Sequence, residues 1–187
     1  MILNDLKEHT SLQHKQLESH PLLHQLTSDD LTLTKYSTIL RKFYGFFSPL
    51  EERIATHISK EQLADLEKRR KSSLLLLDLE RLEQTLPTQI CEDLPEIKNT
   101  AQALGTLYVM EGSTLGGQMI ARQLHKSLGL SPERGTAFFY GYGKDTGKQW
   151  KRFQAALTQF SEEEPQYQRA IYGAQNTFSK FYNWLHV

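Results

Sequence analysis

A histidine and a glutamate one helical turn apart, His14 and Glu18, are the first side chains whose spacing suggests chemistry. Apolar residues at helical spacing predict an amphipathic helix over residues 2–19, on which His14 faces inward. Glu18 can then accept a hydrogen bond from one imidazole nitrogen and leave the other free to bind a metal. Such a histidine is more often a core residue bonded to a neighbour, so the pair alone leaves both interpretations open.

Three glycines interrupt a longer apolar stretch, residues 103–124, in which Gly112, Gly116 and Gly117 follow one another closely. Each costs about 1 kcal/mol relative to alanine inside a helix, so the helix is expected to break or bend there. Glycine also lets bare main chain approach a large, flat ligand. Close packing of another helix on a small-residue face, or a loop between two helices, explains the same pattern.

A basic face is predicted further along, where Lys148, Lys151 and Arg152 recur at helical spacing within residues 146–153. Such a face can hold carboxylates of a ligand through charge-assisted hydrogen bonds. It can equally be a solvated helix surface.

Three segments carry a resemblance to a known family. Residues 107–118, Leu-Tyr-Val-Met-Glu-Gly-Ser-Thr-Leu-Gly-Gly-Gln, resemble the kinked distal helix of the biliverdin-producing heme (haem) oxygenases, especially the bacterial branch associated with phytochromes. Residues 6–18 resemble the family's first helix, where a threonine precedes the proximal histidine by four positions and a glutamate follows it by four. Residues 146–153 resemble the bacterial Thr-Gly-x-x-Trp-x-x-Phe segment.

The resemblance implies a role for each motif. Heme, iron protoporphyrin IX, is cofactor and substrate, and O2 is the oxidant that opens its ring to biliverdin, iron and carbon monoxide. His14 is then the axial ligand of the iron, because one imidazole leaves the opposite coordination site open. The residues expected to contact heme are Lys7, Thr10, His14, Glu18, Tyr108, Lys148, Lys151 and Arg152. The residues expected on the reacting side are Gly112, Ser113, Gly116 and Gly117.

The sequence departs from the animal-type pattern at Ser113, where that pattern has a carboxylate after the first distal glycine. Serine can orient water, which can still deliver protons, but it holds no charge. The resemblance therefore does not carry over the residue that organises protons on the distal side.

Composition places the chain among ordinary globular domains, since 39% of its 187 residues are hydrophobic and 24% are charged. The 22 basic and 22 acidic residues balance, so no global charge favours nucleic acid or a membrane surface. The single Cys91 excludes an intramolecular disulfide and a multi-cysteine cluster. With no export signal or anchor visible, a cytoplasmic protein is expected.

The elements that must position these motifs are all helical. We expect one domain over residues 1–187, a heme-oxygenase-like bundle of about eight helices with a glycine-kinked distal helix. Residues 32–57 predict one or two helices bent at Gly45 or Pro49, and residues 59–86 predict a strongly helical segment. In the latter, the basic cluster of residues 68–71 is expected to be solvated or to dock an acidic electron donor.

Partners follow from what the chain lacks. It has no Gly-x-Gly-x-x-Gly nucleotide fingerprint, so the electrons must come from an external donor such as a ferredoxin or a reductase. The resemblance adds a phytochrome as a possible acceptor of the product. Two other functions stay open: a non-enzymatic heme-binding or storage protein on the same fold, and a heme-free member of the fold such as a thiaminase-like or di-iron enzyme.

Overall fold

The computed structural model describes residues 2–161 and 163–187, and these residues form helices and connections with no strand. The expectation of an all-α fold is confirmed. Within the described ranges, no helix is both long enough and apolar enough to cross a membrane. The α-helices are α1 (Ile2–Glu18), α2 (Pro21–His24), α3 (Leu33–Ala55), α4 (Ser73–Arg81), α5 (Thr100–Leu128), α6 (Ala137–Tyr140), α7 (Thr146–Phe160) and α8 (Gln166–Leu185).

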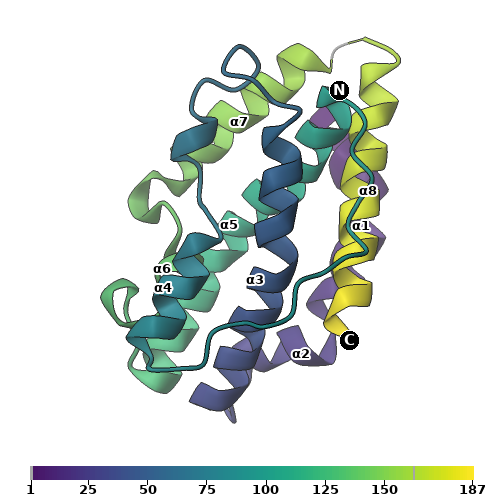
Figure 1. Cartoon of the computed structure of the whole chain (residues 1–187). Coiled ribbons are helices and arrows are strands. Elements are labelled where there is room, and N and C mark those ends of the chain that lie inside the picture. Colours follow the sequence, from purple (N-terminus) through teal and green to yellow (C-terminus); the bar gives the residue numbers. More distant parts are fainter. Residues whose placement is uncertain (1, 162) are drawn as a thin grey trace.

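Figure 1 shows α3 and α5 in the middle, with α1 and α8 on one side and α4, α6 and α7 on the other. The most extensive contact between helices is that of α5 with α8, and small residues allow it. A Cβ atom at Gly105 would collide with the carbonyl oxygen of Ala170, and one at Gly173 with that of Gln102. Helix α1 also packs along α8. Helix α8 therefore contacts both α1 and α5, the helices that carry His14 and the glycines of the predicted site.

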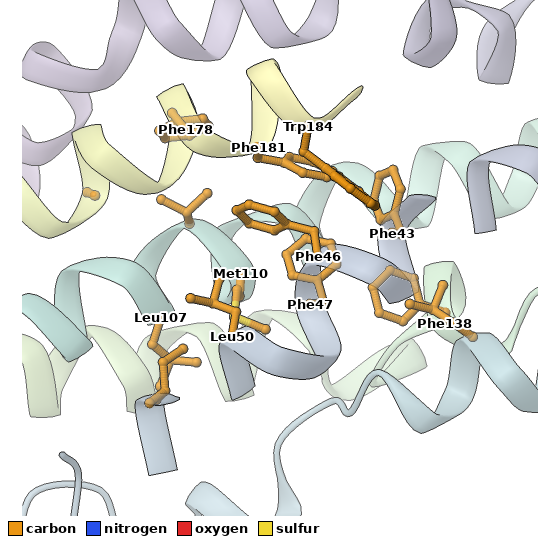
Figure 2. Packing of buried hydrophobic residues seen from close by; sticks show 14 of the residues in the cluster. Phe43, Phe46, Phe47, Leu50, Leu107, Met110, Phe138, Phe178, Phe181 and Trp184 are labelled. Carbon is orange, nitrogen blue, oxygen red and sulfur yellow. The ribbon is translucent and has the colours of Figure 1, made fainter. Parts of the chain in front are cut away.

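An aromatic cluster fills the core between α3, α6 and α8 (Figure 2). The ring of Phe43 meets that of Phe181 edge-on at 5.1 Å, and Phe47 lies 5.2 Å from the same ring. Phe138 extends the cluster to α6, 6.0 Å from Phe43. Edge-to-face contacts of this kind stabilise a core beyond the area that they bury.

Helix α5 runs unbroken through Gly112, Gly116 and Gly117, so the break expected there is wrong. Asn99 caps its start by accepting a hydrogen bond from the backbone N–H of Gln102 at 3.0 Å. Gly129 ends it in a left-handed conformation, with φ of 65°. Residues 101–111 are almost entirely buried, and this tertiary packing outweighs the low helix propensity of the glycines that follow.

The segment before α4 differs most from the sequence prediction. Residues 59–72 form turns and a short 3-10 helix, Leu66–Lys68, instead of the long helix expected over residues 59–86. The backbone is extended at Arg69, with ψ of 156°, so the chain does not continue as a helix there. Arg69 and Arg70 are buried, so this half of the basic cluster is not solvated.

The remaining helices lie close to their expected positions. Helix α1 ends one residue before its predicted end, and α3 is a single helix that continues through Gly45 and Pro49. The side chain of Thr32 begins α3 by accepting a hydrogen bond from the N–H of Lys35 at 3.3 Å.

Candidate functional site

His14 lies on α1 with its ring partly open to solvent, which corrects the expectation that it faces the core. Its side chain is 57% exposed. The ring contacts Phe178 of α8 edge-on, with 5.8 Å between the centroids, and its Nδ1 lies 3.4 Å from Oε2 of Glu18. The pair predicted from the four-residue spacing therefore exists, and it leaves Nε2 as the nitrogen available to a metal.

The buried stripe of α1 runs beside His14 and not through it. Ile2, Leu6 and Thr10 are its buried residues, and Thr10 donates from its hydroxyl to the carbonyl of Leu6 at 2.6 Å. Lys7 is exposed, next to this stripe. Thr10 is thus occupied with its own helix, whereas the ammonium of Lys7 is accessible to a ligand.

One face of α5 is open and largely apolar. Leu115 and Met119, four residues apart and therefore on the same side of the helix, are 46% and 62% exposed. Between them, a Cβ atom added at Gly116 would meet no atom within 4 Å, apart from its own helix. Gly112 lies one turn earlier and faces the ring of Trp150, which such a Cβ would approach to 3.7 Å. This open face, formed by Gly112, Leu115, Gly116 and Met119, offers bare backbone and apolar side chains to a flat ligand.

Gly117 has a different environment from the two other glycines. It is buried, and a Cβ atom there would lie 2.6 Å from the carbonyl oxygen of Phe139 in α6. The close approach that requires glycine at this position is one between two parts of the chain. We therefore assign Gly117 to helix packing and leave it out of the open face.

Aromatic rings from α5 and α7 border Gly112. The ring of Tyr108 lies 5.5 Å from that of Trp150, which in turn stacks on Phe153 at 5.8 Å. Burial raises the pKa of the Tyr108 hydroxyl, so this group stays protonated at neutral pH and can donate a hydrogen bond. Tyr108 therefore combines an apolar ring with a donor beside the open face.

The basic residues of α7 lie at the surface, as the helical spacing predicts. Lys148, Lys151 and Arg152 are all exposed, whereas Phe153 of the same helix is buried. Helix α7 contacts both α1 and α5. Its cations can therefore serve a ligand held by those two helices.

A buried ion pair beneath α5 was not predicted. Nη1 of Arg69 donates to Oε2 of Glu111 at 2.9 Å, and both side chains are at most 3% exposed. Arg69 also binds Asp65, with 2.9 Å between Nη2 and Oδ1. Burial alone would lower the pKa of Arg69, but Glu111 and Asp65 raise it overall. The signal that could have revealed this pair is Glu111 itself, because a carboxylate inside a buried apolar helix requires a partner.

Tyr142 completes the surroundings of Glu111. Its hydroxyl donates to Oε1 of Glu111 at 2.9 Å and accepts from the backbone N–H of Arg70 at 2.7 Å. Burial and then the charge of Glu111 raise the pKa of Tyr142 far above its ordinary value, so the hydroxyl remains a donor.

Arg70 connects this buried region to the open face. It is buried, and its Nη2 donates to the carbonyl of Met110 at 2.7 Å and to the hydroxyl of Ser113 at 2.6 Å. Ser113 itself is exposed on α5, next to Gly112. Ser113, at which the sequence departs from the animal-type pattern, thus accepts a hydrogen bond from the buried cation Arg70.

These features fit an iron porphyrin better than a metal held by several side chains. The described residues contain no group of three or more histidine, cysteine, aspartate or glutamate side chains that could hold an ion, whereas heme iron requires a single imidazole. The cavity beside Glu51 and Arg69 has a volume of about 20 Å³, too small for a macrocycle. His14 on α1 and the open face on α5 are the surfaces that the predicted residues offer to such a ligand.

Comparison with known proteins gives a consistent result. The family model described as heme oxygenase matches residues 1–187. A curated heme oxygenase of Xanthomonas campestris pv. campestris is 30% identical over 151 residues, which cover 80% of this chain and 88% of that protein.

Two solved structures share the fold. The NO- and CO-bound heme oxygenase of Neisseria meningitidis has a TM-score of 0.85 at 21% identity, covering 100% of this chain and 90% of the other. The heme oxygenase of Leptospira interrogans has a TM-score of 0.78 at 19% identity, covering 98% and 97%.

Proposed function

Because this chain belongs to the heme oxygenase family, we propose that it cleaves heme oxidatively to biliverdin, with release of iron and carbon monoxide. The observation that carries this proposal is the pairing of an accessible imidazole on α1 with an open, glycine-containing face on α5, both helices being held by α8. When bound, heme supplies the iron at which dioxygen is activated.

In this proposal, His14 binds the iron through Nε2. Oε2 of Glu18, 3.4 Å from Nδ1, would accept a hydrogen bond from Nδ1–H, which would fix the ring's tautomer and make Nε2 a better ligand. Phe178 limits the rotation of the ring from the side of α8. Thr10 has no direct contact with heme in this proposal, because its hydroxyl donates to the carbonyl of Leu6 in the same helix.

The heme propionates are proposed to meet the accessible cations. Lys7 is the first of them, with Lys148, Lys151 and Arg152 on α7 as further partners. The hydroxyl of Tyr108 adds a neutral donor at the same border. Because charge-assisted bonds to carboxylates depend on geometry, these side chains would orient the macrocycle as well as hold it.

The open face of α5 is proposed to cover the opposite side of the macrocycle. Gly112 and Gly116 allow the backbone to approach, and Leu115 and Met119 exclude water from the rim. No acidic side chain belongs to this face, so a proton must arrive through ordered water, which Ser113 can orient.

Electrons and product call for partners outside the chain. We propose a ferredoxin or a reductase as donor, because the sequence contains neither a nucleotide fingerprint nor a cysteine cluster. A phytochrome as acceptor of biliverdin rests only on the resemblance of residues 107–118 to the phytochrome-associated branch.

The proposal is tested by titrating purified protein with hemin and then adding a reductant in air. Stoichiometric binding followed by the absorption spectrum of biliverdin is the expected result. A protein that binds hemin and leaves it intact with every reductant and donor tried would support heme storage instead. A protein that binds no hemin would refute both functions.

A further inference from the structure

Arg70 and Ser113 share one acceptor, the carbonyl of Met110. Nη2 of Arg70 donates to this carbonyl and to the Ser113 oxygen, and the Ser113 hydroxyl donates to the same carbonyl at 2.7 Å. The carbonyl also lies inside α5, where the backbone N–H four residues later is its helical donor. With Arg70 present, the carbonyl stays satisfied when the hydroxyl rotates outward, since a hydroxyl hydrogen turns to suit its partners.

Among the residues that the structure describes, no carboxylate forms an ion pair or a hydrogen bond with the guanidinium of Arg70. Glu111 and Asp65 are hydrogen-bonded by Arg69, whereas the guanidinium of Arg70 faces a carbonyl, a hydroxyl and the ring of Phe138, 4.1 Å from the ring centroid. Arginine remains charged even when buried. Its positive charge therefore polarises the hydroxyl that it contacts and makes that hydroxyl a stronger donor.

We propose that Arg70 is a positioning residue that presents the hydroxyl of Ser113 as a hydrogen-bond donor to an anionic or electron-rich ligand on the open face of α5. The inference rests on the proposed function and deepens it, because it names the groups that would favour negative charge on a ligand at the open face of α5. Ser113 itself carries no charge, but the guanidinium of Arg70 that contacts its hydroxyl does.

Fluoride binding to the ferric heme complex tests this role without turnover, because fluoride is a small anion whose affinity depends on nearby donors. A lost hydrogen bond to a charged group corresponds to about tenfold or more in affinity. We therefore expect Ser113→Ala and Arg70→Met each to weaken fluoride binding by about tenfold. The double variant should bind fluoride about as well as the single variant with the lower affinity, because Arg70 acts through Ser113.

Arg69→Met is the matched control, since it removes the neighbouring buried cation, which does not contact Ser113. It should lower the melting temperature and leave fluoride affinity within about twofold. If Arg70→Met fails to fold, Ser113→Ala alone still decides, because its side chain is exposed.

Unchanged fluoride affinity in Ser113→Ala would overturn the inference while leaving heme cleavage in place. A full additional loss in the double variant would overturn it as well, by showing that Arg70 acts through its charge alone. A wild-type protein that binds no heme would overturn the proposed function and this inference together.

Discussion

Substituting Gly116 and Gly117 separately distinguishes a ligand surface from a packing contact. A Cβ atom at Gly116 meets nothing within 4 Å outside its own helix, so Gly116→Ala should stabilise the apoprotein by up to about 1 kcal/mol through helix propensity alone. A Cβ atom at Gly117 would lie 2.6 Å from the carbonyl oxygen of Phe139. Gly117→Ala should therefore destabilise the apoprotein by about 1–3 kcal/mol through overpacking.

The consequences for heme should follow the opposite order. Gly116→Leu places a bulky side chain on the open face, where it should impair heme binding or cleavage although the apoprotein remains stable. Gly117→Ala should bind and cleave heme nearly normally at temperatures at which it is folded. The measurements are denaturant unfolding of the apoprotein, ferric heme affinity and the rate of biliverdin formation for each variant. A Gly116→Leu protein that folds and cleaves heme at the wild-type rate would refute this account of the open face.

Three other substitutions test separate parts of the structure. Lys7→Ala should weaken heme binding by about tenfold, while Lys68→Ala, which removes an exposed lysine that is not among the predicted heme contacts, should not; equal affinities by hemin titration would exclude the propionate contact. Glu111→Gln should destabilise the protein by about 3 kcal/mol in denaturant unfolding, because Arg69 loses a buried charged partner; a loss below about 1 kcal/mol would contradict this. Burial raises the pKa of Asp78 to about 6, above its value of about 4 in an unfolded chain, so the native state binds the extra proton between these pH values. The unfolding free energy of wild type relative to Asp78→Asn should therefore fall by about 1.4 kcal/mol per pH unit from pH 4 to 6 and stay constant above, and a rise over that range would contradict the assignment.

The sequence predicts the helices that have strong local signals. Helix α1 spans almost the range predicted for it, residues 2–19, and α3 lies within the predicted residues 32–57. The pairing of His14 with Glu18 also follows from spacing alone, because a four-residue separation is a local property of any helix.

The features that the sequence could not predict depend on contacts between residues far apart in the chain. Arg69 and Arg70 look like part of a solvated basic cluster until Glu111, 42 residues after Arg69, gives the first of them a buried partner. Gly116 and Gly117 are adjacent and chemically identical, yet only Gly117 packs on α6, since the rotation of α5 against its neighbours decides which glycine is open. The exposure of His14 likewise depends on how α1 lies on α8.

Heme cleavage that depends on the imidazole of His14 is the central claim, and a single-turnover assay tests it directly. Wild type, His14→Ala and the control His9→Ala, another exposed histidine of α1, are each loaded with one equivalent of hemin and reduced in air. We expect wild type and His9→Ala to convert heme to biliverdin with release of carbon monoxide. His14→Ala should fold with the same helical content and lose the native heme spectrum, which added imidazole should partly restore. An unchanged spectrum and normal biliverdin yield in His14→Ala would contradict the account.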